Sequence, residues 1–268
     1  YNPSVPPQGE QQVALMNATN AVFNASKTES QDIGDVVLDT EDSVEECRKV
    51  TYKPSKSVYP HEKIIDYGTG CEGADNIRRS GKKMVMVYTD PNTAAAGVLV
   101  TETTFDNYYI DGVKITGMVK AYIESPATSG QRVVKVVATK GLSSGAGDLQ
   151  AYTSTTYVTQ TEGASTPSRM DNVFRITGGA QGYQLTHSDT LFNWTSAIDA
   201  LNPAIKPAGC GNRTQGVVNI NINLLTDTTS FTEILDYGSG TCDNTATLSI
   251  NGGTPKEVRL PLLFWPLY

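Results

Sequence analysis

Two different periods of hydrophobic residues divide the chain. Between Glu10 and about Ser26, apolar residues recur every three or four positions, which predicts an amphipathic helix. A second, shorter helix is predicted from Ile33 to Glu46, because its apolar residues keep helical spacing and its first turn is acidic. From Cys47 onward the period changes to two, which is typical of strands with one buried face. We therefore expect a helical N-terminal segment followed by a β domain.

The β part is predicted to consist of many short strands. Turn sequences such as Asp90-Pro91-Asn92 and Asn251-Gly252-Gly253 separate them, and such short connections indicate antiparallel hairpins, since parallel strands need long crossovers. The stretch Asp189–Lys206, which ends near two prolines, is expected to be the longest irregular loop. The predicted strands are Val50–Lys53, Lys63–Tyr67, Lys82–Tyr88, Gly97–Phe105, Val113–Glu124, Arg132–Thr139, Ala151–Thr161, Val173–Thr177, Tyr183–Thr186, Val217–Leu224, Phe231–Asp236, Ala246–Ile250 and Lys256–Leu260.

Strict alternation predicts which strand faces are buried. In Val217–Leu224, three asparagines share one face and aliphatic residues share the other, so the asparagine face is expected to be solvent-exposed and the aliphatic, dry face to be buried. A sheet wrapped over the N-terminal helix, or curled into an open barrel or sandwich, would bury the dry face. The expected fold class is thus mainly β, with α+β character at the N-terminus. Residues 1–46 would form a flexible leader and helices. Residues 47–268 would form a long antiparallel meander, as one domain or as two related halves over 47–165 and 170–260.

One phrase occurs twice, once near each end of the β part. Ile64–Cys71 reads IIDYGTGC and Ile234–Cys242 reads ILDYGSGTC. Each copy leads an apolar strand into a glycine-rich turn that ends on a cysteine, and each has one further cysteine upstream. The repetition indicates two matching corners of a β scaffold.

The four cysteines are best explained by two disulfides. Four cysteines permit three pairings, and their parallel placement beside the two turns favours Cys47–Cys71 and Cys210–Cys242. Each bridge would be worth about 3 kcal/mol through loop entropy. The alternative, reactive thiols or a metal site, has few other ligands available. Disulfides predict an oxidising, extracytoplasmic compartment.

Charge argues against a nucleic-acid partner. The net charge is -7, and residues 29–46 contain eight acidic residues and no Lys or Arg. The rest of the chain then has 20 acidic against 21 basic residues, which is close to neutral. Nucleic-acid binding needs clustered positive charge, so this class of partner is not expected. The acidic stretch is read as a solvated helix face.

The motifs of the β part resemble those of a family of uncharacterised secreted lipoproteins from Bacteroidota-type bacteria. These motifs are IIDYGTGCEGADNIRRSGKKMVMVYTD, TTFDNYYIDGVKITGMV, DNVFRITGGAQG and ILDYGSGTCDNTATLSINGGTPKEVRL, which cover most of residues 47–260. The resemblance implies a location in the periplasm or at the outer membrane or cell surface, and no known activity. It also implies a lipid anchor on the precursor, although the anchoring cysteine is not in the sequence and Tyr1 is read as a trimmed start. The apolar tail, residues 261–268, is expected to pack on the core.

Catalytic motifs are weak. Gly141-Leu142-Ser143-Ser144-Gly145 matches the nucleophile elbow G-x-S-x-G, but β-like sequence follows where that motif needs a helix, so a hairpin turn is the better interpretation. His61 and His187 are expected at the surface. Acidic residues at the turns lack the regular spacing of a calcium loop, and turn formation explains them. We expect no metal, no cofactor and no catalytic residue.

Aromatic residues are the remaining candidates for binding. Tyr108, Tyr109 and Trp194 would suit a sugar-stacking platform, although tyrosine is also an ordinary residue of half-exposed strands. The sequence therefore predicts a non-enzymatic envelope protein with a structural or binding role, and a glycan or a lipid as ligand. The alternatives are a hydrolase of envelope or dietary polymers and an adhesin or assembly subunit. The oligomeric state is not predicted.

Overall fold

In a computed structural model, the described residues form one helix and fifteen β-strands. The described residues are 10–37, 47–73, 77–125, 131–143, 148–163, 171–186, 189–210, 212–225 and 229–260. The elements are α1 (Glu10–Val37), β1 (Lys49–Lys53), β2 (His61–Asp66), β3 (Cys71–Glu72), β4 (Arg78–Val87), β5 (Leu99–Ile110), β6 (Val113–Ser125), β7 (Val133–Ser143), β8 (Asp148–Glu162), β9 (Val173–Thr186), β10 (Asp189–Ile198), β11 (Ala204–Pro207), β12 (Gln215–Leu224), β13 (Ser230–Ser239), β14 (Thr245–Ile250) and β15 (Lys256–Arg259).

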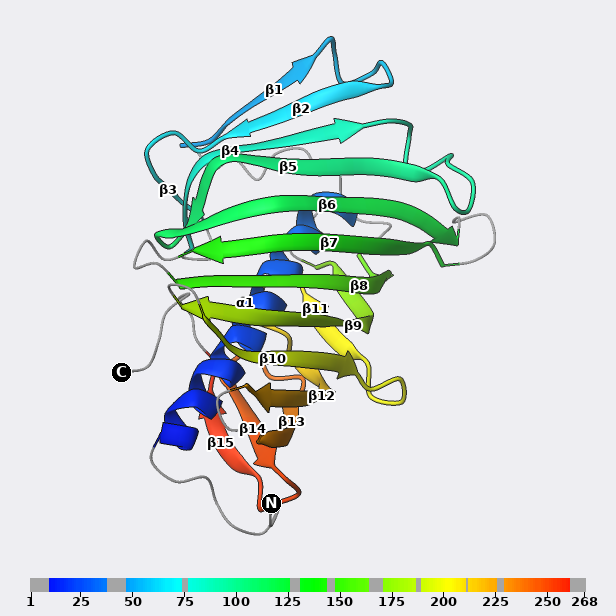
Figure 1. Ribbon diagram of the computed structural model, residues 1–268. Helices are drawn as coiled ribbons and strands as arrows, with labels where there is room; N and C mark the ends of the chain where they lie inside the picture. The colour runs from blue at the N-terminus through cyan, green and yellow to red at the C-terminus, as the bar shows by residue number, and fades with distance from the viewer. Residues whose placement is uncertain are drawn as a thin grey trace.

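All fifteen strands belong to one antiparallel sheet (Figure 1). The main path runs β1-β2-β4-β5-β6-β7-β8-β9-β10-β12-β13-β14-β15, so most sequence neighbours are also neighbours in space. Strand β3 pairs with β4, and β11 branches off to pair with β9 and β12. The mainly β, antiparallel, curved-sheet prediction is confirmed.

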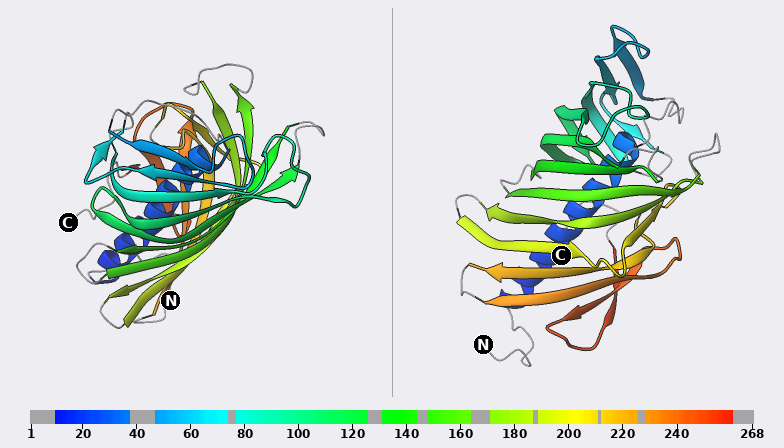
Figure 2. Two further views of the ribbon diagram at one scale, coloured as in Figure 1. Left: turned by 90° about the horizontal axis from the view of Figure 1, so that it is seen from above. Right: turned by 90° about the vertical axis from the view of Figure 1, so that its right-hand side faces the viewer.

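The sheet curves around α1, which crosses the strands on the concave face (Figure 2). Alternation explains this, because each strand has one apolar face and α1 has an apolar side to cover it. Leu15, Ala18 and Val22 of α1 belong to the same buried cluster as Ile220 and Phe231 of the sheet. Helix and sheet therefore share one core. A second buried cluster on the sheet lies around β6, β7 and the start of β9.

The helix is longer than the sequence predicts. We expected one helix to end near Ser26 and another to begin at Ile33, and the stretch between them is polar. In the structure α1 is continuous from Glu10 to Val37, so it includes the first predicted helix, the polar stretch and the start of the second predicted helix. Thr28 and Glu29 of this stretch are buried against the sheet, where they have polar partners. The remainder of the second predicted helix, the leader and the apolar tail lie outside the described residues. Among the described residues, no helix is long and apolar enough to span a membrane.

The expected irregular loop over Asp189–Lys206 is also wrong. Residues Asp189–Ile198 form β10, in the middle of the sheet, and Ala204–Pro207 form β11. The reason is visible in the segment LFNWTSAI, where Phe192 and Trp194 alternate with polar residues and are both buried. The prolines near its end reflect the short branch strand β11 rather than a long loop.

Candidate functional site

The two repeated phrases form matching, disulfide-linked corners. The bridges are Cys47–Cys71 and Cys210–Cys242, which confirms the favoured pairing. Among the described residues no cysteine is free. The disulfides indicate an oxidising, extracytoplasmic environment.

Both corners use the same local turn. The Asp66 carboxylate accepts a hydrogen bond from the Gly68 backbone N–H at 2.9 Å, and Asp236 accepts one from Gly238 at 2.8 Å. Both glycines have positive φ, 57° and 87°, which a side chain would disfavour. The backbone N–H of Gly68 also lowers the pKa of Asp66, together with Lys82. These acids therefore shape turns, as Asx residues do.

The described residues offer no metal centre. No group of three or more His, Cys, Asp or Glu residues lies close enough to hold a metal ion in this part of the chain. Asp243 accepts hydrogen bonds from the backbone N–H and the hydroxyl of Thr245, at 2.9 and 3.0 Å. Asn244 accepts one from Asn212. Asp66, Asp236 and Asp243, three of the turn acids, thus accept hydrogen bonds within their own turns.

The residues considered for hydrolysis do not assemble. His61 was expected at the surface but is 1% exposed, packed between Tyr52 and Tyr59 with its Nδ1 3.0 Å from the Val58 carbonyl. Ser143 is the last residue of β7, which pairs with β8, so the G-x-S-x-G sequence leads from strand to strand. His187 lies outside the described residues. His61 begins β2, which β4, β5 and β6 separate from β7, so His61 and Ser143 are not brought together.

Two of the three predicted sugar-stacking residues are core residues. Trp194 is 1% exposed and Tyr108 is fully buried, whereas Tyr109 is half-buried. Trp194 packs on the concave side over Gly182, where an added Cβ would lie 2.7 Å from the indole ring. Tyr108 stacks with Phe105 at 5.5 Å between ring centroids. Neither Trp194 nor Tyr108 offers a surface platform, because their strands turn these side chains inward.

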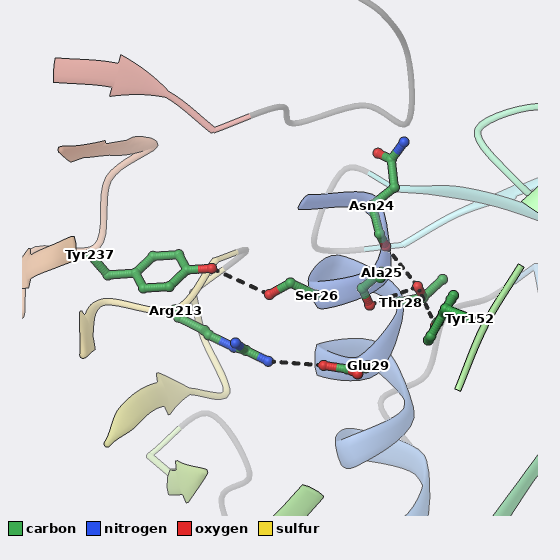
Figure 3. A network of polar contacts seen from close by, with 8 residues as sticks. All are labelled: Asn24, Ala25, Ser26, Thr28, Glu29, Tyr152, Arg213 and Tyr237. Atoms are coloured by element: carbon green, nitrogen blue, oxygen red, sulfur yellow. Dashed lines mark hydrogen bonds and ion pairs between the residues drawn. The ribbon is translucent and has the colours of Figure 1, made fainter. Parts of the chain in front are cut away.

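Polar contacts fasten α1 to the concave face (Figure 3). Glu29 forms a buried ion pair with Arg213 at 3.3 Å, and the Ser26 hydroxyl lies 3.3 Å from the Tyr237 hydroxyl. On the other side, Tyr152 donates a hydrogen bond to Thr28 at 2.8 Å. These links explain why a polar stretch can lie inside the molecule.

A buried carboxyl group belongs to the same helix–sheet interface. Glu233 on β13 is 1% exposed, and its Oε1 lies 2.6 Å from the Thr19 hydroxyl, which is also 2.9 Å from the Leu15 carbonyl. A hydroxyl carries one proton, so Thr19 cannot donate to both oxygens. A protonated Glu233 satisfies the arrangement, since it donates to Thr19, which then donates to Leu15. Burial correspondingly raises the pKa of Glu233 to about 7.

The raised pKa of Glu233 predicts that the protein loses stability as pH rises. The folded state holds this proton more tightly than the unfolded state, whose pKa is near 4.5, so the free energy of unfolding falls from about pH 4.5 to about pH 7 and is then constant. The loss for this group is about 3 kcal/mol at most. The Glu233→Gln variant keeps a hydrogen-bond donor to Thr19 through its side-chain amide and cannot become charged. We expect it to be more stable than the wild type at pH 8 and similar at pH 4.5.

Urea denaturation at both pH values measures this difference. Glu257→Gln is the matched control, because Glu257 is exposed on the edge strand β15. A wild-type minus Glu233→Gln difference that does not change with pH would contradict the buried, protonated carboxyl.

The convex face carries an uncharged polar surface over β7 to β13. Its middle row crosses six strands in register, and every member is exposed and neutral. Two flanking rows are also free of charged residues. The middle row is Thr139, Thr153, Gln181, Thr195, Asn221 and Thr232; the flanking rows are Ala151, Tyr183, Asn193, Asn223 and Ser230, and Thr155, Gly179, Ala197, Asn219 and Ile234. We name these three rows the neutral face.

The other half of the convex face is different in character. Over β1 to β6 it carries ion pairs, such as Lys82–Asp66 at 3.5 Å and Lys120–Glu102 at 3.3 Å. The neutral face is therefore a feature of one half of the sheet and not a general property of its outer surface.

Side-chain amides on the neutral face are already ordered by one another. Asn223 Nδ2 donates to Asn193 Oδ1 at 2.8 Å, and the Ser230 hydroxyl donates to Asn223 Oδ1 at 2.8 Å. An amide has two donor hydrogens and an acceptor oxygen, so each retains capacity for a ligand. The three alternating asparagines of β12 were visible in the sequence, but the row across the strands was not.

Tyr183 is the exposed aromatic residue of the neutral face. It is 42% exposed, and its register partner on β8 is Ala151, followed on β7 by Gly141. These two positions carry no side chain beyond a methyl group, so nothing long from β7 or β8 stands beside the tyrosine in this row. Tyr183 was not predicted from the sequence, because only the strand register shows which tyrosines point outward.

Comparison with known proteins gave no match: no protein-family model, no curated protein and no solved structure is significantly similar to this chain. The lipoprotein resemblance therefore stays a prediction.

Proposed function

We propose that this chain is a non-enzymatic, extracytoplasmic protein of the bacterial cell envelope that binds glycans on its neutral face. The observation that carries the proposal is the exposed, uncharged array of amides and hydroxyls with one exposed tyrosine beside it. The lipoprotein resemblance supports an envelope location and a lipid anchor on the precursor.

The chemistry of the face favours sugar over lipid. Sugar hydroxyls both donate and accept hydrogen bonds, as do the Asn, Gln and Thr side chains of the three rows. The faces of a pyranose ring are apolar enough to stack on an aromatic ring, the role given to Tyr183. A lipid chain would need a contiguous apolar surface, which these polar rows do not supply.

The first test is the Tyr183→Ala variant. Because stacking and the buried ring area are lost together, we expect its affinity for a bound polysaccharide to fall about tenfold, or about 1.4 kcal/mol. Affinity electrophoresis through gels that contain soluble polysaccharides measures this. Tyr88→Ala is the matched control, since Tyr88 is 40% exposed but lies beyond β4, outside the neutral face.

Two outcomes would overturn the proposal. One is a wild-type protein that no glycan retards. The other is equal retardation of the wild type and Tyr183→Ala. Tyr183→Phe separates stacking from the hydroxyl, and it should bind nearly as well as the wild type.

A further inference from the structure

The ligand of the neutral face can be specified further, provided that the proposed function holds. We propose that it is an uncharged, linear polysaccharide that lies across the strands, along the row from Thr139 to Thr232, with about one sugar for each strand.

The shape of the neutral face indicates the direction in which the polysaccharide lies. The middle row spans six strands, which at about 4.8 Å per strand is about 24 Å. Along the strands the three rows cover four residue steps, or about 14 Å. The face ends at exposed or half-buried leucines on one side, such as Leu225, and at Lys135 and Asp236 on the other. Its long axis therefore runs across the strands.

The curvature of the sheet is compatible with that direction. The strands bend around α1, whereas successive strands from β7 to β12 follow one another along the helix (Figures 1 and 2). A chain on the convex side that runs parallel to the helix thus meets the least curvature. Neighbouring strands are rotated by about 20–25°, so a soluble chain that can turn suits the row better than a rigid crystalline surface.

The spacing of the row matches a sugar polymer. One strand separation is close to the length of one pyranose ring in an extended chain, so each strand can present one hydroxyl or amide to each successive sugar. Small side chains, Gly179 and Ala197, lie beside the row on β9 and β10. They leave Gln181 and Thr195 accessible to a chain laid over them.

The absence of charge among the residues of the three rows gives the ligand class. A uronate, sulfate or phosphate group would be bound by Lys or Arg, and none stands on the neutral face. The face is therefore expected to discriminate against anionic polymers and to bind neutral ones.

The experiment uses the full chain with its disulfides intact. Arabinoxylan, soluble amylose and hydroxyethylcellulose serve as neutral probes, and polygalacturonate and alginate as anionic ones. For the neutral polymer that binds, calorimetry then measures oligosaccharides from the disaccharide to the octasaccharide. We expect affinity to rise about tenfold for each sugar that adds two hydrogen bonds, and to level off once the row is filled.

A lysine at the far end of the row tests the direction. Thr232 is three strands from Tyr183, about 15 Å away across the sheet. In Thr232→Lys we expect the hexasaccharide to bind about tenfold more weakly, through loss of about two hydrogen bonds, and the disaccharide to bind as before. Ser57→Lys, in the exposed β1–β2 connection, adds the same charge as a control.

The outcomes separate this inference from the proposed function. Affinity that does not rise beyond the disaccharide, preference for an anionic polymer, or equal behaviour of Thr232→Lys and Ser57→Lys would overturn the linear neutral ligand while sugar binding at Tyr183 stands. If no polysaccharide binds, or if Tyr183→Ala binds like the wild type, the proposed function fails and the inference fails with it.

Discussion

Replacing Trp194 with alanine is expected to lower the free energy of unfolding by about 3–5 kcal/mol, as large cavities in cores do. The indole is 1% exposed and lies in the helix–sheet core, 6.3 Å from the Tyr152 ring between centroids. Gly182 is fitted to it and has no side chain to fill the space. Urea denaturation measures the loss as a lower midpoint at an unchanged slope.

Two further variants identify the cause of that loss. Asn193→Ala changes the preceding residue on the convex face, where we expect a change within about 0.5 kcal/mol. Trp194→Phe should cost much less than Trp194→Ala, because it keeps most of the volume and removes an indole N–H that has no hydrogen-bond partner among the described residues. If Trp194→Ala were as mild as Asn193→Ala, the indole would not be a core residue, and its role as a binding residue would reopen.

The local sequence pattern was sufficient to predict those features of the fold that depend on residues close together in the chain. Alternation in β12 correctly predicted that Ile220 and Ile222 are buried while Asn219 and Asn221 are exposed. Turn sequences predicted the antiparallel order of the strands. The repeated phrase predicted the two disulfide corners, because the strand, the Asp-Gly turn and the cysteine all lie within a few residues of one another.

The features that the sequence did not predict depend on contacts between residues far apart in the chain. Thr28 and Glu29 interrupt the apolar face of α1, and each has a polar partner more than a hundred residues away, Tyr152 and Arg213. The neutral face depends on the register of six strands, so no single segment of sequence reveals it. Tyr108 is buried and Tyr183 is exposed because their strands turn them to opposite faces of the sheet. Amino-acid composition cannot distinguish these two tyrosines.

Removal of the buried arginine at the helix–sheet interface is expected to destabilise the fold by about 3–5 kcal/mol, because it removes the ion-pair partner of a buried carboxylate, Glu29. Arg213 is 4% exposed and Glu29 7% exposed, and the guanidinium also lies 6.0 Å from the centre of the Tyr237 ring. Arg213→Met keeps much of the side-chain length and removes the charge. Chemical denaturation at neutral pH measures the cost.

A second substitution should recover most of that cost. Glu29→Leu combined with Arg213→Met replaces the ion pair with apolar contacts, and such replacements are often neutral or stabilising. Lys53→Met is the control, because it breaks an exposed pair with Glu62, worth less than about 1 kcal/mol. A double variant no more stable than Arg213→Met alone would show that the arginine acts through Tyr237 or the nearby corner and not through Glu29. If the double variant recovers the free energy of unfolding, neither charge is needed once both are removed. Apolar packing would then stabilise α1 on the sheet, and the ion pair would fix its position there.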